Sequence, residues 1–197
     1  MTKSAAYIAV SLFLGLCISC TKSNRQDKTS FTKADSLTES YLNLEDSLLH
    51  AWNVMAWDEK DKIKSMHEIL RMMLEQGGFD KQQVRALEQR LEQLDRIRFT
   101  QKSLANSYVI EEYDFASNSL VSEILSLAES TDELVKNEKA QKLVDKIKLA
   151  ETRVNDYREE YDRIANRYNQ FLEENEKYLK DIDHIGEKKA LFQMASQ

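Results

Sequence analysis

The sequence contains no proline and only four glycines in 197 residues. Proline breaks the interior of an α-helix and glycine weakens it, so their scarcity over this length favours an all-α chain. Charged residues make up 31% of the chain and apolar residues 42%, a balance that suits long amphipathic helices with solvated outer faces. The length allows one domain with an elongated core.

The chain also lacks a net positive charge, because its 34 acidic residues outnumber its 28 lysines and arginines and give a formal net charge of −6. A nucleic-acid partner needs a basic face that neutralises phosphates, so the sequence predicts no nucleic-acid binding. Neither a Gly-x-Ser-x-Gly motif nor a glycine-rich phosphate loop is present. The only histidines, His50, His67 and His184, lack the spacing of a metal site. We therefore expect a protein that is not an enzyme and that holds no metal or cofactor.

Long hydrophobic runs are limited to the first residues of the chain. Lys3 precedes the apolar run 5–16, which is short for a membrane-spanning helix and typical of a secretory signal. The following Ile18-Ser19-Cys20 resembles a bacterial lipobox, where signal peptidase II cleaves before a cysteine that carries diacylglycerol. We expect a signal peptide over residues 1–19 and lipidation of Cys20. An uncleaved signal anchor and a plain secreted protein are the alternatives.

The chain has only two cysteines, and the predicted cleavage removes one of them, Cys17. The mature chain would then hold no disulfide, and its lipid would anchor it to a bacterial membrane, facing an extracytoplasmic compartment. Residues 20–35, rich in Ser, Thr, Lys, Asn and Gln, read as a polar tether. Residues 36–197 form the predicted bundle domain.

Three helical stretches are predicted in that domain. Ser36-x-x-Glu39 is a capping box for the first, which Gly77-Gly78 ends. Asp80 caps the second, in which 106–107 and 117–119 are candidate bends, and Ser130-x-x-Glu133 starts the third, which can run past Gly186. Short connections force neighbouring helices to be antiparallel. The expected fold is an elongated antiparallel up-down bundle of three long helices, or of four segments if one bends.

The third stretch carries the most regular pattern in the chain. Its apolar stripe has a spacing of alternating threes and fours that favours supercoiled packing. The stripe comprises Ala140, Leu143, Ile147, Ala150, Val154, Tyr157, Tyr161, Ile164, Tyr168, Phe171, Asn175, Tyr178, Ile182 and Ile185. Its four tyrosines are either bundle core with hydroxyls at the rim or an aromatic groove that receives a partner helix. Asn175 either fixes the register or marks a bend.

Part of this stretch resembles the signature helix of the LemA family of bacterial envelope proteins. The matching residues are Glu151, Val154, Arg158, Tyr161, Asp162, Tyr168 and Asn169, in a pattern with Tyr-Asn or Tyr-Asp steps seven residues apart. The resemblance implies a membrane-tethered antiparallel bundle on the extracytoplasmic side. Glu151 and Arg158 are too far apart to pair within one helix, so we expect Arg158 to pair with an acidic residue of the first or second stretch.

These observations favour a non-enzymatic envelope lipoprotein that scaffolds or docks another envelope protein. The alternative function is an extracytoplasmic module that binds a small amphipathic or lipid ligand in an aromatic cavity. Self-association through the long stripe is a further expectation, because three helices need not cover it along its whole length.

Overall fold

Two helices of more than forty residues, α2 and α6, dominate the computed structural model of the chain. The structure describes residues 32–97, 100–180 and 185–192. The chain divides into two units, Met1–Lys33 and Ala34–Gln197, and the packing described below lies within the second. The predicted signal peptide and Cys20 lie outside the described residues. Among the helices that are described, none has a stretch both long and apolar enough to cross a membrane.

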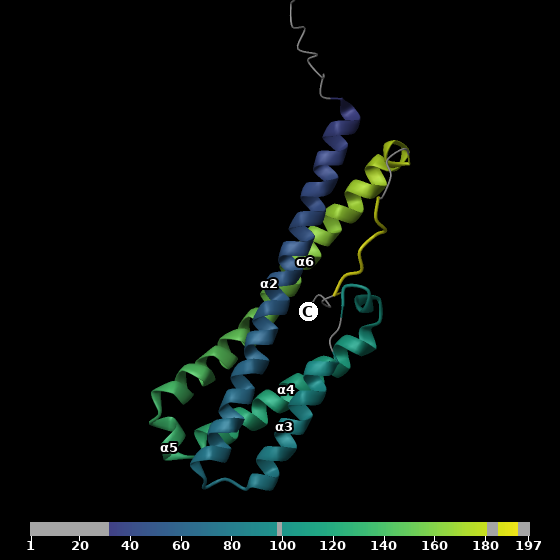
Figure 1. Cartoon of the computed structure of the whole chain (residues 1–197). Helices are drawn as coiled ribbons and strands as arrows, with labels where there is room; N and C mark the ends of the chain where they lie inside the picture. The colour runs from purple at the N-terminus through teal and green to yellow at the C-terminus, as the bar shows by residue number, and fades with distance from the viewer. Residues whose placement is uncertain (1–31, 98–99, 181–184, 193–197) are drawn as a thin grey trace, which may run out of the picture. The chain divides into compact units, whose positions relative to one another are not determined.

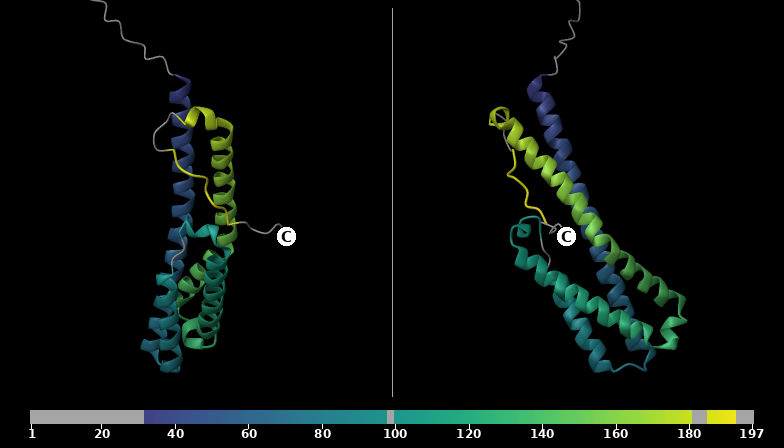
Figure 2. Two further views of the ribbon diagram at one scale, coloured as in Figure 1. Left: turned by 90° about the vertical axis from the view of Figure 1, so that its right-hand side faces the viewer. Right: turned by 180° about the vertical axis from the view of Figure 1, so that it is seen from behind.

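The described residues form helices and connecting segments without a β-strand. In chain order the elements are α2 (Lys33–Gln76), α3 (Lys81–Arg96), the 3-10 helix η1 (Ser103–Ala105), α4 (Ser107–Glu129), α5 (Asp132–Val135) and α6 (Glu138–Leu179). The four longer helices run alternately up and down (Figures 1 and 2). The predicted all-α antiparallel bundle is therefore confirmed, in its four-segment form.

Local sequence signals explain most of the helix ends. Gly77 and Gly78 adopt φ of 74° and 85°, a region that favours glycine, and so end α2. The side chain of Asp80 accepts a hydrogen bond from the Gln82 N–H at 2.8 Å, which caps α3 as predicted. Asn106 and Asn137 cap α4 and α6 in the same way. The bend expected at 106–107 is thus the break between two helices.

Four predicted boundaries are wrong. Ser36 lies inside α2, which begins at Lys33, and the other candidate bend, 117–119, lies inside α4. Ser130 closes α4 instead of opening the next helix, since its hydroxyl donates to the Leu127 carbonyl at 2.7 Å. The last helix ends at Leu179, so Ile185 lies beyond it and not on a helical stripe.

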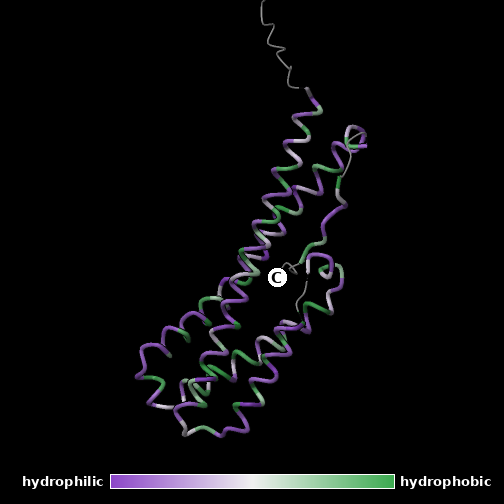
Figure 3. Tube along the Cα trace, viewed as in Figure 1, coloured by the Kyte–Doolittle hydropathy of each residue, from purple (hydrophilic) through white to green (hydrophobic). Residues whose placement is uncertain are grey.

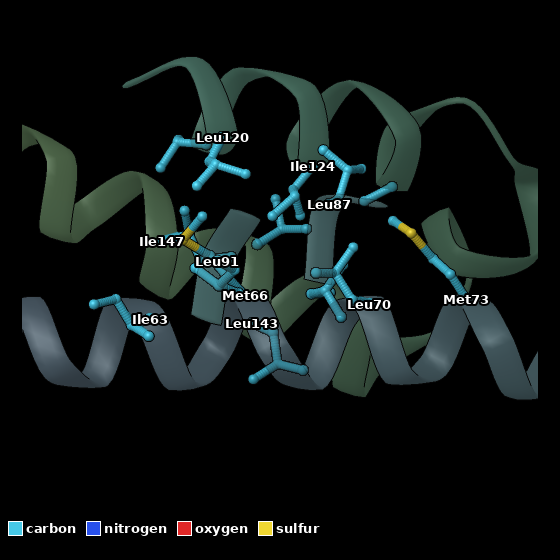
Figure 4. Packing of buried hydrophobic residues seen from close by; sticks show 14 of the residues in the cluster. Ile63, Met66, Leu70, Met73, Leu87, Leu91, Leu120, Ile124, Leu143 and Ile147 are labelled. Carbon is cyan, nitrogen blue, oxygen red and sulfur yellow. The ribbon is translucent and has the colours of Figure 1, made fainter. Parts of the chain in front are cut away.

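One apolar cluster fills the half of the bundle where all four longer helices meet. Side chains from α2, α3, α4 and α6 converge there (Figure 4), and hydrophobic positions recur along the traces of these helices (Figure 3). Its buried members include Ile63, Met66, Leu70, Met73, Leu87, Leu91, Leu120, Ile124, Leu143 and Ile147. The buried residues of α3 all belong to this cluster, whereas α4 also contributes Ile110 to the second cluster described next.

A second apolar cluster lies between the other halves of α2 and α6. Its buried members are Tyr41, Leu48, Ala51, Leu104, Ile110, Tyr161, Ile164, Ala165 and Tyr168. Here the C-terminal segment, defined as Ile185–Phe192, packs against the cluster with Ile185, Ala190, Leu191 and Phe192. In this half the stripe on α6 therefore packs against α2, with contributions from η1, α4 and the non-helical C-terminal segment.

The first cluster supplies a test of this packing. Leu91 is fully buried at the centre of the cluster, so Leu91→Ala should lower the free energy of unfolding by about 3 kcal/mol. Leu149→Ala is the control, because Leu149 lies on α6 with 52% of its surface exposed. It should change stability by less than about 0.5 kcal/mol. Urea unfolding followed by circular dichroism measures both, and equal losses would contradict the assignment of the core.

Candidate functional site

The C-terminal segment (Ile185–Phe192) follows an extended path back along α6 (Figure 1). Two α6 side chains hold its main chain. Asn169 donates to the Lys189 carbonyl at 2.9 Å and accepts from the Lys189 N–H at 2.7 Å. Asp162 accepts the Phe192 N–H at 2.8 Å. These hydrogen bonds go to main-chain atoms of the segment. The segment is therefore held in the way that peptide-binding proteins hold an extended peptide.

The third main-chain contact comes from α2. The Gly186 N–H donates to the Tyr41 hydroxyl at 2.9 Å, and the Tyr41 ring packs 5.8 Å from that of Tyr168. A Cβ added at Gly186 would lie 2.8 Å from the Tyr168 hydroxyl, closer than real Cβ contacts allow. The Tyr168 ring is fully buried and has little room to move. This position therefore requires glycine.

An aromatic pocket receives the side chain of Phe192. Its ring stacks on Trp52 of α2 at 6.4 Å and meets the Tyr161 ring edge-on at 5.6 Å. The Arg158 guanidinium lies 5.0 Å from the Phe192 ring centroid, a cation–π distance. Lys189 makes a second such contact, with its ammonium 5.0 Å from the Tyr168 ring. We call the whole surface that contacts the segment the α2/α6 groove: Tyr41, Trp52, Arg158, Tyr161, Asp162, Tyr168 and Asn169.

A buried polar network lies between the two apolar clusters. Lys62 of α2 is only 3% exposed, and its ammonium contacts Glu59 at 2.9 Å, Glu151 at 2.6 Å and Ser117 at 3.0 Å. Burial lowers the pKa of Lys62, but the two carboxylates outweigh it and hold the pKa above its usual value. The Tyr113 hydroxyl donates to Glu59 at 2.6 Å. The network thus joins α2, α4 and α6 through one buried lysine.

Two arginines of α6 extend the network. Arg158 is 8% exposed and makes a bidentate pair with Asp114 of α4 at 2.6 and 2.7 Å. Asp114 lies in the second predicted helical stretch, so the expected partner of Arg158 is confirmed. Arg153 pairs with Asp58 of α2. Burial raises the pKa of Asp58, although Arg153 acts in the opposite direction.

A cavity of about 500 Å³ opens beside this network. Five carboxylates line it against three basic groups, together with three aromatic side chains. The lining residues are Trp52, Met55, Ala56, Asp58, Glu59, Lys60, Lys62, Ile63, Asp95, Thr100, Tyr113, Asp114, Ser117, Asn118, Glu151, Val154, Asn155, Tyr157 and Arg158. Carboxylates therefore outnumber basic groups in the lining, a composition that favours small cations over anions or lipid chains.

The structure brings the seven predicted signature residues to one face of α6. Glu151 and Arg158 belong to the polar network, and Val154 lines the cavity beside them. The other four, Tyr161, Asp162, Tyr168 and Asn169, belong to the α2/α6 groove. Of the four stripe tyrosines, Tyr161 and Tyr168 are buried and Tyr178 is 51% exposed. Tyr161 and Tyr168 thus belong to the bundle core, as the first interpretation predicts, although the Tyr161 hydroxyl is buried and not at the rim. The extended C-terminal segment, not a partner helix, packs against these two rings.

Several residues of the site were not predicted as such. Lys62 stands in a run of charged residues that looks like a solvated interruption of the first helix. Gly186 and Phe192 lie outside any periodic pattern, and only their packing against α2 and α6 gives them a role. The predicted absence of a metal site is untested; within the described residues, no group of three or more potential metal ligands occurs. His50 is exposed and His67 half-buried.

Two buried tyrosines of the site differ in how their hydroxyls are partnered. The Tyr113 hydroxyl bonds to Glu59, whereas the Tyr161 hydroxyl has no hydrogen-bond partner within the described residues. Burial raises the pKa of Tyr161 to about 12, with a smaller effect of the Asp162 charge, and burial also raises that of Tyr113. Neither hydroxyl ionises at neutral pH.

These two tyrosines form a matched pair of substitutions. Tyr113→Phe removes a buried hydrogen bond and should lower the free energy of unfolding by about 1–2 kcal/mol. Tyr161→Phe removes an unpartnered buried hydroxyl and should raise stability by about 1 kcal/mol. Urea unfolding at pH 7 distinguishes the two. A loss of similar size in both variants would show that the Tyr161 hydroxyl is satisfied in solution.

Comparison with known proteins finds no relative of this chain. No family model matches the chain, and neither a curated protein nor a solved structure matches it. The resemblance to the LemA family therefore rests on the signature residues alone and remains a prediction.

Proposed function

We propose that the chain is a lipid-anchored, non-enzymatic envelope protein of the LemA type that docks another envelope protein. One observation carries the proposal: the α2/α6 groove holds an extended segment through its main chain and one aromatic anchor. Proteins that recognise extended peptides use this combination, with backbone bonds for affinity and pockets for specificity. The lipobox-like Ile18-Ser19-Cys20 supports tethering of the groove to a membrane.

In-cell crosslinking tests the docking role. The full chain, tagged after Gln197, is crosslinked in its native cells, extracted in detergent and compared with the Cys20→Ser variant by quantitative mass spectrometry. We expect one envelope protein to be enriched with the lipidated form and lost with Cys20→Ser. Reciprocal tagging of that protein should recover the chain. Recovery of the chain alone, or of equal partners with both forms, would contradict tethered docking.

The cavity supports a second candidate function, the binding of a small molecule. Its volume lies in the range of ligand pockets, and its walls combine aromatic rings with an excess of carboxylates. These walls favour a small organic cation, held by carboxylates and by cation–π contacts, over a lipid. The polar lining comes from α2, α4 and α6, with Asp95 from α3, so a bound ligand would bridge four helices.

Native mass spectrometry of the chain purified from its own cells tests this candidate. A small co-purified molecule should appear as a discrete mass increment on the folded chain. Ala56→Trp is the matched variant, because Ala56 is an exposed residue of the cavity lining and an indole there would fill the opening. The increment should disappear in that variant. A chain without any increment, or one retained in Ala56→Trp, would rule out the cavity as its site.

A further inference from the structure

One exposed face of α2 runs along about eight turns of the helix. Its nine positions follow one another at spacings of three and four residues, which keeps them within an arc of about 80° on a straight α-helix. They are Asp35, Glu39, Leu42, Asp46, Leu49, Asn53, Trp57, Lys60 and Lys64, and we call them the outer α2 face. Leu42, Leu49 and Trp57 are 52%, 55% and 69% exposed, so the described part of the chain leaves this face largely uncovered.

Charge is distributed unevenly along the outer α2 face. Asp35 and Glu39 make its first end acidic, whereas Lys60 and Lys64 make its last end basic. Glu39, Lys60 and Lys64 are exposed, and none of them forms an ion pair with a described residue. Asp61 is exposed as well, but it lies about 100° around the helix from Lys60, at the edge of the face. The face is therefore acidic at one end, apolar in its middle and basic at the other end.

Such a face is complementary to itself in one direction only. A second copy that runs antiparallel places its basic end against the acidic end of the first, and the two-fold symmetry repeats this match at the other end. A parallel copy would place like charges together at both ends. We infer that the outer α2 face pairs antiparallel with the outer α2 face of a second copy of the chain, forming a symmetric dimer. This surface is distinct from the α6 stripe, and the inference does not depend on the proposed docking function.

One register of the antiparallel pair satisfies both charged ends. When the two-fold axis passes just after Leu49, Glu39 faces Lys60 of the second copy. In the same register Asp35 faces Lys64 of the second copy. Because the contact is symmetric, each of these ion pairs forms twice. Four ion pairs thus fix the direction and the register of the dimer.

The middle of the face is matched in the same register. Leu42 faces Trp57 of the second copy, and Asp46 faces Asn53, whose amide group can donate to the carboxylate. Beside Trp57 the surface is hollowed into a shallow depression whose lining includes Tyr157 of α6 and the lysines of the basic end. Leu42 of the second copy lies opposite this depression. A protruding leucine therefore meets an aromatic hollow at each end of the apolar part.

Carbodiimide crosslinking tests the pairing in the wild-type chain, because it joins a carboxylate to an ammonium in contact with it. Within one copy Glu39 and Lys60 are about 31 Å apart along α2, so a link between them can form only between copies. Unlabelled and isotope-labelled full chain are mixed in detergent, allowed to exchange subunits and crosslinked. Mass spectrometry should find linked Glu39 and Lys60 peptides of mixed isotope composition. The absence of mixed links between the two ends would overturn the inference.

A charge exchange tests the direction of the pairing. Lys60→Glu places a carboxylate opposite Glu39 twice in the dimer, so it should raise the dissociation constant of the dimer at least about tenfold, and Glu39→Lys should do the same. The combined variant Glu39→Lys/Lys60→Glu restores opposite charges in an antiparallel dimer and should return the constant to within about threefold of wild type. Sedimentation equilibrium of the full chain in density-matched detergent measures all four. A combined variant that stays as weak as the single ones would contradict antiparallel pairing.

An exposed leucine at the axis supplies the matched control pair. Leu49→Glu brings two carboxylates together at the axis and should weaken the dimer at least about tenfold, whereas Leu149→Glu, at a leucine of similar exposure on α6, should leave it unchanged. Both positions are exposed, so circular dichroism should show native helicity for both variants. If the two variants sediment alike, the outer α2 face is not the dimer interface and the inference is wrong.

Discussion

A difference in helix length governs this bundle. α2 and α6 have 44 and 42 residues, whereas α3 and α4, which pack against them, have 16 and 23. At 1.5 Å per residue the long pair extends roughly 65 Å and the shorter helices only about 24 and 35 Å. The shorter helices therefore cannot flank the long pair along its whole length. Over the remaining length α6 packs against α2, with Leu104 of η1 and Ile110 of α4, and the C-terminal segment adds to this packing.

The polar network lies between the half of the bundle that holds the first apolar cluster and the half that holds the second. Lys62 connects α2 to α4 and α6 at this junction, and Arg158 both pairs with Asp114 and contacts the ring of Phe192. Buried charges of this kind are costly when one partner is removed, and they specify geometry more than they add stability. Arg158 thus couples the packing of α4 to the position of the C-terminal segment.

Helix content, the Gly77-Gly78 turn, the Asp80 cap and the stripe up to Tyr168 could all be predicted, because each depends on residues within one or two helical turns. The pairing of Arg158 with another helix was expected because Glu151, seven residues away on the same helix, is too far to pair with it. The roles of Asp162 and Asn169 could not be predicted, since their partners lie 20 to 30 residues further on, in a stretch without periodicity. The break between α3 and α4 was predicted at Asn106. Its consequence, that these two helices flank only part of the length of α6, was not predicted.

The hydrogen bonds in the α2/α6 groove have a consequence for how this chain can evolve. Asp162 and Asn169 bond to main-chain atoms of the segment, and every residue but proline supplies the main-chain N–H donor equally. Positions such as 187 and 188, both exposed, are thus free to drift, while selection acts on Gly186, Phe192 and the helix beneath them. Across homologous chains, the sequence of the C-terminal segment should diverge much faster than that of α6, while the segment still packs in the α2/α6 groove.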